Sequence, residues 1–105
     1  MGTTKERSEI FRAKINLETA QISWKELQRF FAGGTALHVS VDLDLIEAAF
    51  QISEDNKMQV KEWLENGQLG KVSDQQAMAW LESDATVWAV VVSPYVLVQT
   101  AERLQ

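Results

Sequence analysis

The acidic pair Asp42 and Asp44 is the first place in the chain where residue type and spacing could support chemistry. Two carboxylates this close can bind a hard cation such as Mg²⁺ or Ca²⁺. A calcium loop, however, needs Gly at its sixth position, and Glu47 stands there if Asp42 is the first. Asp44 followed by Glu47 also has the spacing of a helix N-cap and its partner. We therefore favour a capping role for Asp44 and a solvated carboxylate at Asp42 over a metal site.

The single histidine, His38, shares one side of a predicted strand with Ser40 and Asp42. Four strand steps of about 3.3 Å separate His38 from Asp42 by about 13 Å, which is too far for a Ser–His–Asp triad. The chain has no Gly-x-Ser-x-Gly motif and no cysteine, which excludes a thiolate nucleophile, a disulfide and any cysteine-based metal site. We find no catalytic motif, expect no cofactor and no metal, and lean towards a protein that is not an enzyme.

A second polar set consists of Glu18, Lys71 and Asp74. Lys71 lies just before a helix predicted to start at Ser73, and the N–H groups at a helix start attract anions. Asp74 in the first turn would repel an anion, however, and an exposed lysine beside a capped helix explains the same residues. These three residues form the candidate polar site of an alternative function, a small-molecule or anion-binding protein or a weak enzyme.

The elements that must position these residues begin with a helix near the N-terminus. Its apolar residues recur with helical spacing in two adjacent bands, which extend the helical pattern to residue 22. Lys14 and Glu18 fall between the bands, four residues apart, and we interpret them as a surface ion pair. The bands contain Ile10, Ala13, Leu17 and Ala20, and Phe11, Ile15 and Ile22.

The rest of the chain alternates between helix starts and strands. Capping boxes at Thr3, Ser23 and Ser73 predict helix starts, and Gly33-Gly34 should end the helix that follows Ser23. Strands are predicted over residues 37–41, 69–72, 87–92 and 95–99, and the third, apolar on both faces, should lie inside the sheet. The sequence thus predicts one α+β domain over residues 1–105, with a small mixed β-sheet of three or four strands and about five helices packed on it.

Charge is distributed unevenly along the chain. The net charge is −5, the sum of +2 for residues 1–31 and −7 for the remainder. An acidic body repels phosphate backbones, so we expect no nucleic-acid partner. The longest uncharged stretch, residues 85–100, is too short and too interrupted to span a bilayer, and residues 1–12 show no secretory signal. We therefore expect a cytoplasmic protein without a membrane partner.

The aromatic residues divide into two groups. Trp24, Trp63 and Trp80 fall on apolar helix faces and are predicted to anchor the core. Trp88 and Tyr95 come from the segment that is apolar on both sides, so they are the candidate interface residues. Either a second copy of the chain, in a homodimer, or the long N-terminal helix could cover the second face of the sheet.

Two segments are distinctive, residues 17–20 (Leu-Glu-Thr-Ala) and residues 88–99 (Trp-Ala-Val-Val-Val-Ser-Pro-Tyr-Val-Leu-Val-Gln). Together with residues 23–32, Leu43-Asp44-Leu45 and residues 71–74, they resemble a family of short bacterial proteins classed only as a domain of unknown function. The resemblance covers about residues 10 to 100, and the family typically has Trp in place of Tyr95. It implies a small bacterial cytoplasmic protein and supplies no activity, ligand or catalytic residue.

Two functional hypotheses follow from the sequence. The first is a protein-interaction module that self-associates, because a short chain has little material with which to cover both faces of an apolar strand. The second is the small-molecule or anion-binding protein described above. A flat apolar patch would favour the first hypothesis, and a deep pocket lined by Glu18, Lys71 and Asp74 would favour the second.

Overall fold

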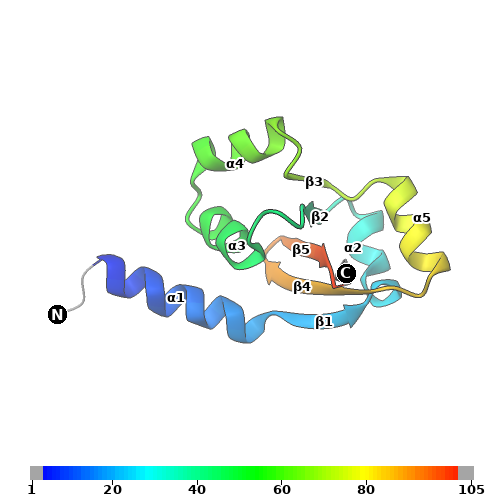
Figure 1. Cartoon of the computed structure of the whole chain (residues 1–105), viewed down its shortest axis with the longest axis horizontal. Helices are drawn as coiled ribbons and strands as arrows, with labels where there is room; N and C mark the ends of the chain where they lie inside the picture. Colours follow the sequence, from blue (N-terminus) through cyan, green and yellow to red (C-terminus); the bar gives the residue numbers. More distant parts are fainter. Residues whose placement is uncertain (1–3, 102–105) are drawn as a thin grey trace.

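A computed structural model describes residues 4–101 of the chain, with side chains described from Arg7 onwards (Figure 1). A short 3₁₀ helix, η1, lies between the first strand and the second α-helix. In chain order the elements are α1 (Thr4–Glu18), β1 (Ala20–Ser23), η1 (Trp24–Leu27), α2 (Gln28–Ala32), β2 (Ala36–Val39), α3 (Leu45–Ser53), α4 (Lys57–Glu65), β3 (Leu69–Lys71), α5 (Asp74–Glu82), β4 (Thr86–Val92) and β5 (Tyr95–Thr100).

One mixed sheet organises the fold. Its strand order is β1-β4-β5-β2-β3, and every neighbouring pair is antiparallel except β2 and β5, which are parallel. The predicted α+β class is confirmed, and β4 lies inside the sheet as predicted. The sheet has five strands, however, and not the three or four expected.

The additional strand is β1, which the sequence pattern assigned to the N-terminal helix. The helix ends at Glu18, where the Thr19 hydroxyl donates a 2.8 Å hydrogen bond to the Ile15 carbonyl. The chain then extends and pairs with β4, so that Ala20 faces Ala89 and Ile22 faces Val87. Ala20 and Ile22 fall in the two different bands if the chain is helical and on one side if it is a strand, and pairing with the edge of β4 selects the strand.

Helices of the same chain cover both faces of the sheet. On one face α3, α4 and Ile15 of α1 pack over Val90 and Leu97. On the other face η1 and α5 pack over the side chains of β4 and β5 that point the opposite way. The strand side chains that the sequence offered to a second copy are therefore mostly buried, including Val87, Val90, Val96, Leu97 and Val98.

Local capping signals were partly correct. Asp44 caps α3 by accepting from the backbone N–H groups of Ile46 and Glu47, and Ser73 with Gln76 forms the predicted capping box of α5. Ser23 makes no side-chain cap bond, because a 3₁₀ turn begins there and α2 starts only at residue 28. Thr3 lies outside the described residues.

Candidate interaction surface and cleft

Helix α1 is anchored along one side only. Phe11 packs edge-to-face on Phe50 of α3, with ring centroids 5.9 Å apart, and Ile15 is buried in the same cluster. Arg12 donates two hydrogen bonds to the Glu47 carboxylate, at 2.9 and 3.2 Å, and its guanidinium carbon lies 4.0 Å from the centre of the Phe50 ring. These contacts hold α1 against α3.

The Arg12–Glu47 pair also shifts the titration of both groups. The hydrogen bond from Arg12 lowers the pKa of Glu47, and a bond from Gln51 adds to the effect. The same bond to Glu47 raises the pKa of Arg12. Both side chains are about one-third exposed, so solvent screens the pair and its contribution to stability is modest.

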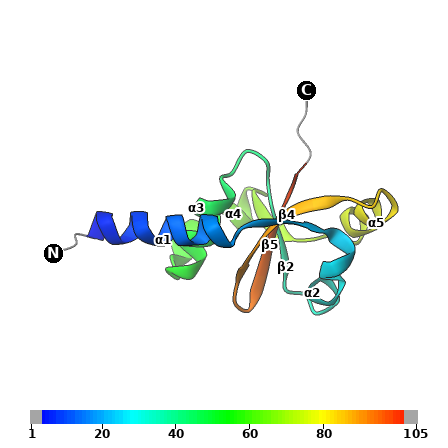
Figure 2. The same ribbon diagram turned by 90° about the horizontal axis from the view of Figure 1, so that it is seen from below.

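The opposite side of α1 is apolar and open to solvent. Ile10 is 70% exposed and Leu17 is 84% exposed, and the exposed Ala13 lies between them on the same helix face. We call these three residues the α1 stripe. Figure 2 shows α1 in front of the molecule when seen from below, with no other element covering it. One of the two predicted apolar bands thus meets α3, and the other remains uncovered.

Trp88 lines an open cleft between the end of α1, the β2–α3 loop and the sheet. Trp88 is 37% exposed, whereas Trp24 and Trp63 are buried. The cleft has a volume of about 440 Å³. We call it the Trp88 cleft, and it is lined by Asn16, Thr19, Val41, Asp42, Leu43, Asp44, Leu45, Ile46, Trp88 and Gln99.

The β2–α3 loop on one side of the cleft is fixed by Gln99 from β5. The Gln99 amide nitrogen donates to the carbonyls of Ser40 and Leu43, both at 2.7 Å. Within the loop, the Ser40 hydroxyl donates to Asp42 and lowers the pKa of this carboxyl. Gln99 and Asn16 could not be assigned to one site from the sequence, because they come from opposite ends of the chain and neither belongs to a catalytic or ligand-binding motif.

Tyr95 lies apart from Trp88, at the other end of the β4–β5 hairpin. It is half-buried beside a groove of about 520 Å³ between this hairpin turn and α4. Trp88 pairs with Gln99 and Tyr95 with Val92, so the two candidate interface residues are at opposite ends of the strand pair. They do not form one patch.

The candidate polar residues Glu18, Lys71 and Asp74 are not brought together either. Glu18 ends α1 next to β1, whereas Lys71 ends β3 at the opposite edge of the sheet. Four strand spacings, about 19 Å, separate these edges. Lys71 and Asp74 are close in sequence at the start of α5, but they form no ion pair among the described residues, and the Lys71 ammonium lies against Gly34.

His38 is occupied by structural contacts. Its Nδ1 lies 3.2 Å from the Gln76 amide nitrogen, and its ring packs on Trp80 with centroids 5.7 Å apart. Partial burial lowers the pKa of His38, which keeps the imidazole neutral at pH 7. Ser40 bonds to Asp42 and not to His38, consistent with the distance expected along the strand.

Neither a membrane-spanning helix nor a cluster of metal ligands is found in residues 4–101. Within that range no helix is long and apolar enough to cross a membrane. Across the described side chains, no group of three or more His, Cys, Asp or Glu residues is arranged to hold a metal ion. In the β2–α3 loop, Asp42 accepts from the Ser40 hydroxyl and Asp44 caps α3.

Comparison with protein families gives a match over residues 10–100 to the family described as "Protein of unknown function (DUF2288)". The chain belongs to this family. A solved structure with the description "NMR solution structure of PA1075 from Pseudomonas Aeruginosa" is 43% identical, with a TM-score of 0.79, and the match covers 98% of this chain and 95% of that one. No curated protein matches the chain.

Three of the segments that carry the DUF2288 resemblance meet at one place. Thr19 of residues 17–20, Leu43-Asp44-Leu45, and Trp88 and Gln99 of residues 88–99 all line the Trp88 cleft. These segments are distant in sequence, and the sheet and α1 bring them together. The cleft therefore draws on three of the segments that carry the resemblance.

Proposed function

We propose that this member of the DUF2288 family is a small protein-interaction module that self-associates through the α1 stripe. The observation that carries the proposal is the exposure of Ile10 and Leu17 on a helix whose other side is firmly packed. Contiguous exposed apolar residues on a soluble protein commonly mark an interaction site. The stripe replaces the apolar sheet as the candidate surface, because the chain covers the sheet itself.

The stripe is self-complementary when two copies of α1 run antiparallel. With a two-fold axis at Ala13, Ile10 of one copy lies near Leu17 of the partner subunit, and the reverse contact follows by symmetry. Ala13 is small, so the two helices can approach closely at the axis.

The charged residues beside the stripe fit the same arrangement. At 100° per residue, Arg7 and Glu18 lie on one flank of the stripe, near its two ends. Antiparallel pairing places Arg7 of one copy beside Glu18 of the partner subunit, twice over. Two opposite-charge pairs favour this orientation, although each adds little affinity at an exposed site.

The expected dimer is weak. A single pair of short helices buries about 1,000 Å² or less in total, which is the size class of transient complexes. Association should therefore appear at micromolar concentrations and above, and fall with dilution.

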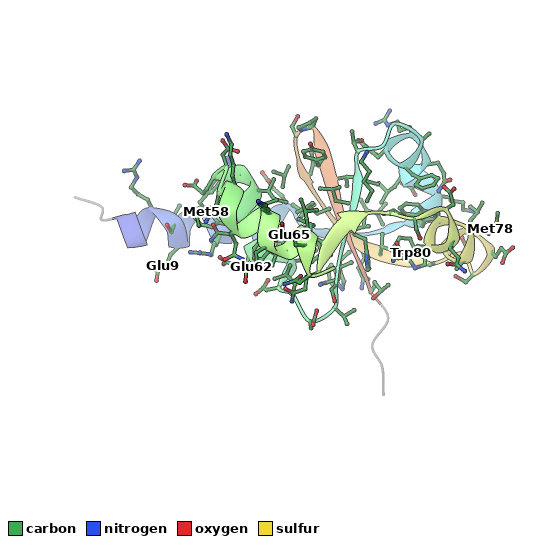
Figure 3. All side chains as sticks on the ribbon, turned by 90° about the horizontal axis from the view of Figure 1, so that it is seen from above. Glu9, Met58, Glu62, Glu65, Met78 and Trp80 are labelled. Atoms are coloured by element: carbon green, nitrogen blue, oxygen red, sulfur yellow. The ribbon has the colours of Figure 1, made fainter. Side chains whose placement is uncertain are left out.

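Sedimentation velocity between about 10 and 500 µM tests the proposal. We expect the parent chain to shift towards a dimer with concentration and Leu17→Asp to remain monomeric. Met58→Asp is the matched control, because Met58 is 85% exposed and lies on α4, across the molecule from α1 (Figure 1 and Figure 3). A parent that is monomeric throughout, or equal effects of the two substitutions, would contradict the proposal. Loss of the dimer in Trp88→Ala but not in Leu17→Asp would move the interface to the cleft.

A further inference from the structure

We infer that the Trp88 cleft is a binding site for an organic cation, an alkylammonium or guanidinium group on an aliphatic stem. The site is separate from the α1 stripe, since Asn16 and Thr19 line the cleft and none of the three stripe residues does. The inference rests on the cavity itself, on the exposed indole of Trp88 and on the hydrogen-bonding capacity of the polar side chains around it.

The polar lining of the cleft consists mostly of acceptors. Asp44 accepts from two backbone N–H groups as the α3 cap, and Asp42 is an ionised carboxylate that already accepts from Ser40. The Thr19 hydroxyl donates its hydrogen bond to the Ile15 carbonyl, which leaves its oxygen as an acceptor. Both amide hydrogens of Gln99 are used on the loop carbonyls, which leaves its oxygen as the group it can offer a ligand.

Free donors and positive charge are scarce in the same place, because Asp44 already accepts from the N–H groups of Ile46 and Glu47 at the start of α3. The described residues that line the cleft include no lysine, arginine or histidine. Apart from the Thr19 hydroxyl and the Gln99 amide, which donate to backbone carbonyls, their side-chain donors are the Asn16 amide and the Trp88 indole N–H. The Arg12 guanidinium is within electrostatic range of Asp44 but is held by Glu47. A ligand that supplies donors and a positive charge therefore complements this lining, and an anion does not.

The apolar part of the cleft specifies the rest of the ligand. Trp88 presents an indole, the aromatic ring that attracts cations most strongly, and Val41, Leu43 and Ile46 provide aliphatic surface beside it. A short alkyl chain can lie on these side chains while its charged end meets the Asp42 carboxylate. Two sources carry this chemistry, namely a free amine and the lysine or arginine side chain of a protein partner.

The affinity of one such group should be low. The cleft is open, and a cation–π contact at an exposed site contributes about 0.5–1 kcal/mol. Losing a contact of that strength weakens binding by about 2–5-fold. We therefore expect millimolar dissociation constants for small probes, within reach of NMR titration.

The test is a titration of the full chain, labelled with ¹⁵N, with n-butylammonium, n-butylguanidinium and the neutral 1-butanol. The indole N–H signals of the four tryptophans act as reporters, and those of Trp24, Trp63 and Trp80 are internal controls. We expect saturable shifts of the Trp88 signal with the two cations and not with 1-butanol. Equal binding of 1-butanol, or shifts spread over all four indoles, would overturn the inference.

Two variants separate the charge of the cleft from the charge of the protein. Asp42→Asn should weaken binding of n-butylammonium by about 2–5-fold. Asp74→Asn changes the net charge equally on α5, away from the cleft, and should leave the affinity unchanged. Equal losses in the two variants would mean a general electrostatic effect and would overturn the site. The Leu17→Asp variant should bind the probes like the parent, which keeps this result independent of self-association.

A comparison of a short arginine peptide with the free probe distinguishes the two sources of the cation. The tripeptide acetyl-Gly-Arg-Gly-amide carries the guanidinium on a backbone, and n-butylguanidinium carries it alone. Tighter binding of the peptide would support a protein side chain as the natural occupant, and tighter binding of the free probe would support a small amine. Failure of both to shift the Trp88 signal would overturn the inference.

Discussion

Replacing Trp63 by alanine should destabilise the protein severely, because this side chain holds α4 on the rest of the fold. Trp63 is 7% exposed and belongs to the core cluster formed by α3, α4 and one face of the sheet. Truncating a buried tryptophan costs about 3–5 kcal/mol, as lost burial plus the cavity left behind. A domain of this size has a total stability of about 5–15 kcal/mol, so the loss is a large share of it.

Urea unfolding followed by far-UV circular dichroism measures this loss without relying on tryptophan fluorescence. With a slope of about 2 kcal/mol per molar urea, the midpoint should fall by about 2 M. Leu64→Ala is the matched control, because Leu64 is the next residue of the same helix and is 51% exposed. That substitution should cost about 1 kcal/mol or less.

Two results would refute this account of α4. One is a Trp63→Ala protein within 1 kcal/mol of the parent, which would mean that the cluster repacks or that α4 is not needed. The other is an equal loss in Leu64→Ala, which would mean that the two faces of the helix are assigned incorrectly.

Other substitutions test the opposite face of the sheet and the titrating groups. Trp80→Ala should lower the free energy of unfolding by about 3 kcal/mol, because the Trp80 ring packs edge-to-face on Trp24 with ring centroids 5.0 Å apart. A melting temperature within a degree or two of the parent would contradict this. Ser73→Ala should cost about 1 kcal/mol in thermal melts through loss of the α5 cap. Because the pKa of Glu47 is lowered in the folded state, Glu47 stabilises the fold above pH 4.5, and this stabilisation is lost as the pH falls through its folded-state pKa. Glu47→Gln should therefore reduce the dependence of the melting temperature on acid pH. The lowered pKa of His38 disfavours the folded state below pH 6.5, and His38→Leu should remove that slope.

The parts of the fold that the sequence predicted well are those set by local chemistry. Residues 87–92 are apolar on both sides, and such a run is stable only inside a sheet, where β4 lies. Asp44 and Ser73 act as caps because their side chains reach N–H groups two or three residues ahead. These outcomes depend on few distant contacts, so a pattern of residue types is enough to predict them.

Failures of prediction arose where distant parts of the chain decide the result. The two apolar bands of α1 look equivalent in sequence, and it is the packing of α1 on α3, including Phe11 on Phe50, that buries one band and leaves Leu17 exposed. Ser23 with Glu26 has the spacing of a capping box, but pairing of β1 with β4 runs up to Ser23, and a 3₁₀ turn follows. Local patterns list such alternatives, and long-range packing selects among them.

The candidate site shows the same division. Trp88 could be singled out from the sequence as an aromatic residue on a strand that is apolar on both sides. In the structure it is the most exposed of the four tryptophans. Its polar neighbours Asn16 and Gln99 could not be, because their role depends on α1 and β5 reaching the same loop. Gln99 shows this most clearly, since its effect on the cleft comes from two backbone carbonyls that it holds in place.

Helix α1 connects the packing of the protein to its proposed association. Phe11, Arg12 and Ile15 fix one side of the helix to α3, so the α1 stripe on the other side has a defined position before any partner arrives. Binding through a rigid element avoids the entropy cost of ordering a flexible one. A short helix with little apolar area can therefore still support a measurable, though weak, two-fold contact. If α1 were loosely attached, ordering it would consume most of the binding energy of so small an interface, and the exposed Ile10 and Leu17 would not be enough for self-association.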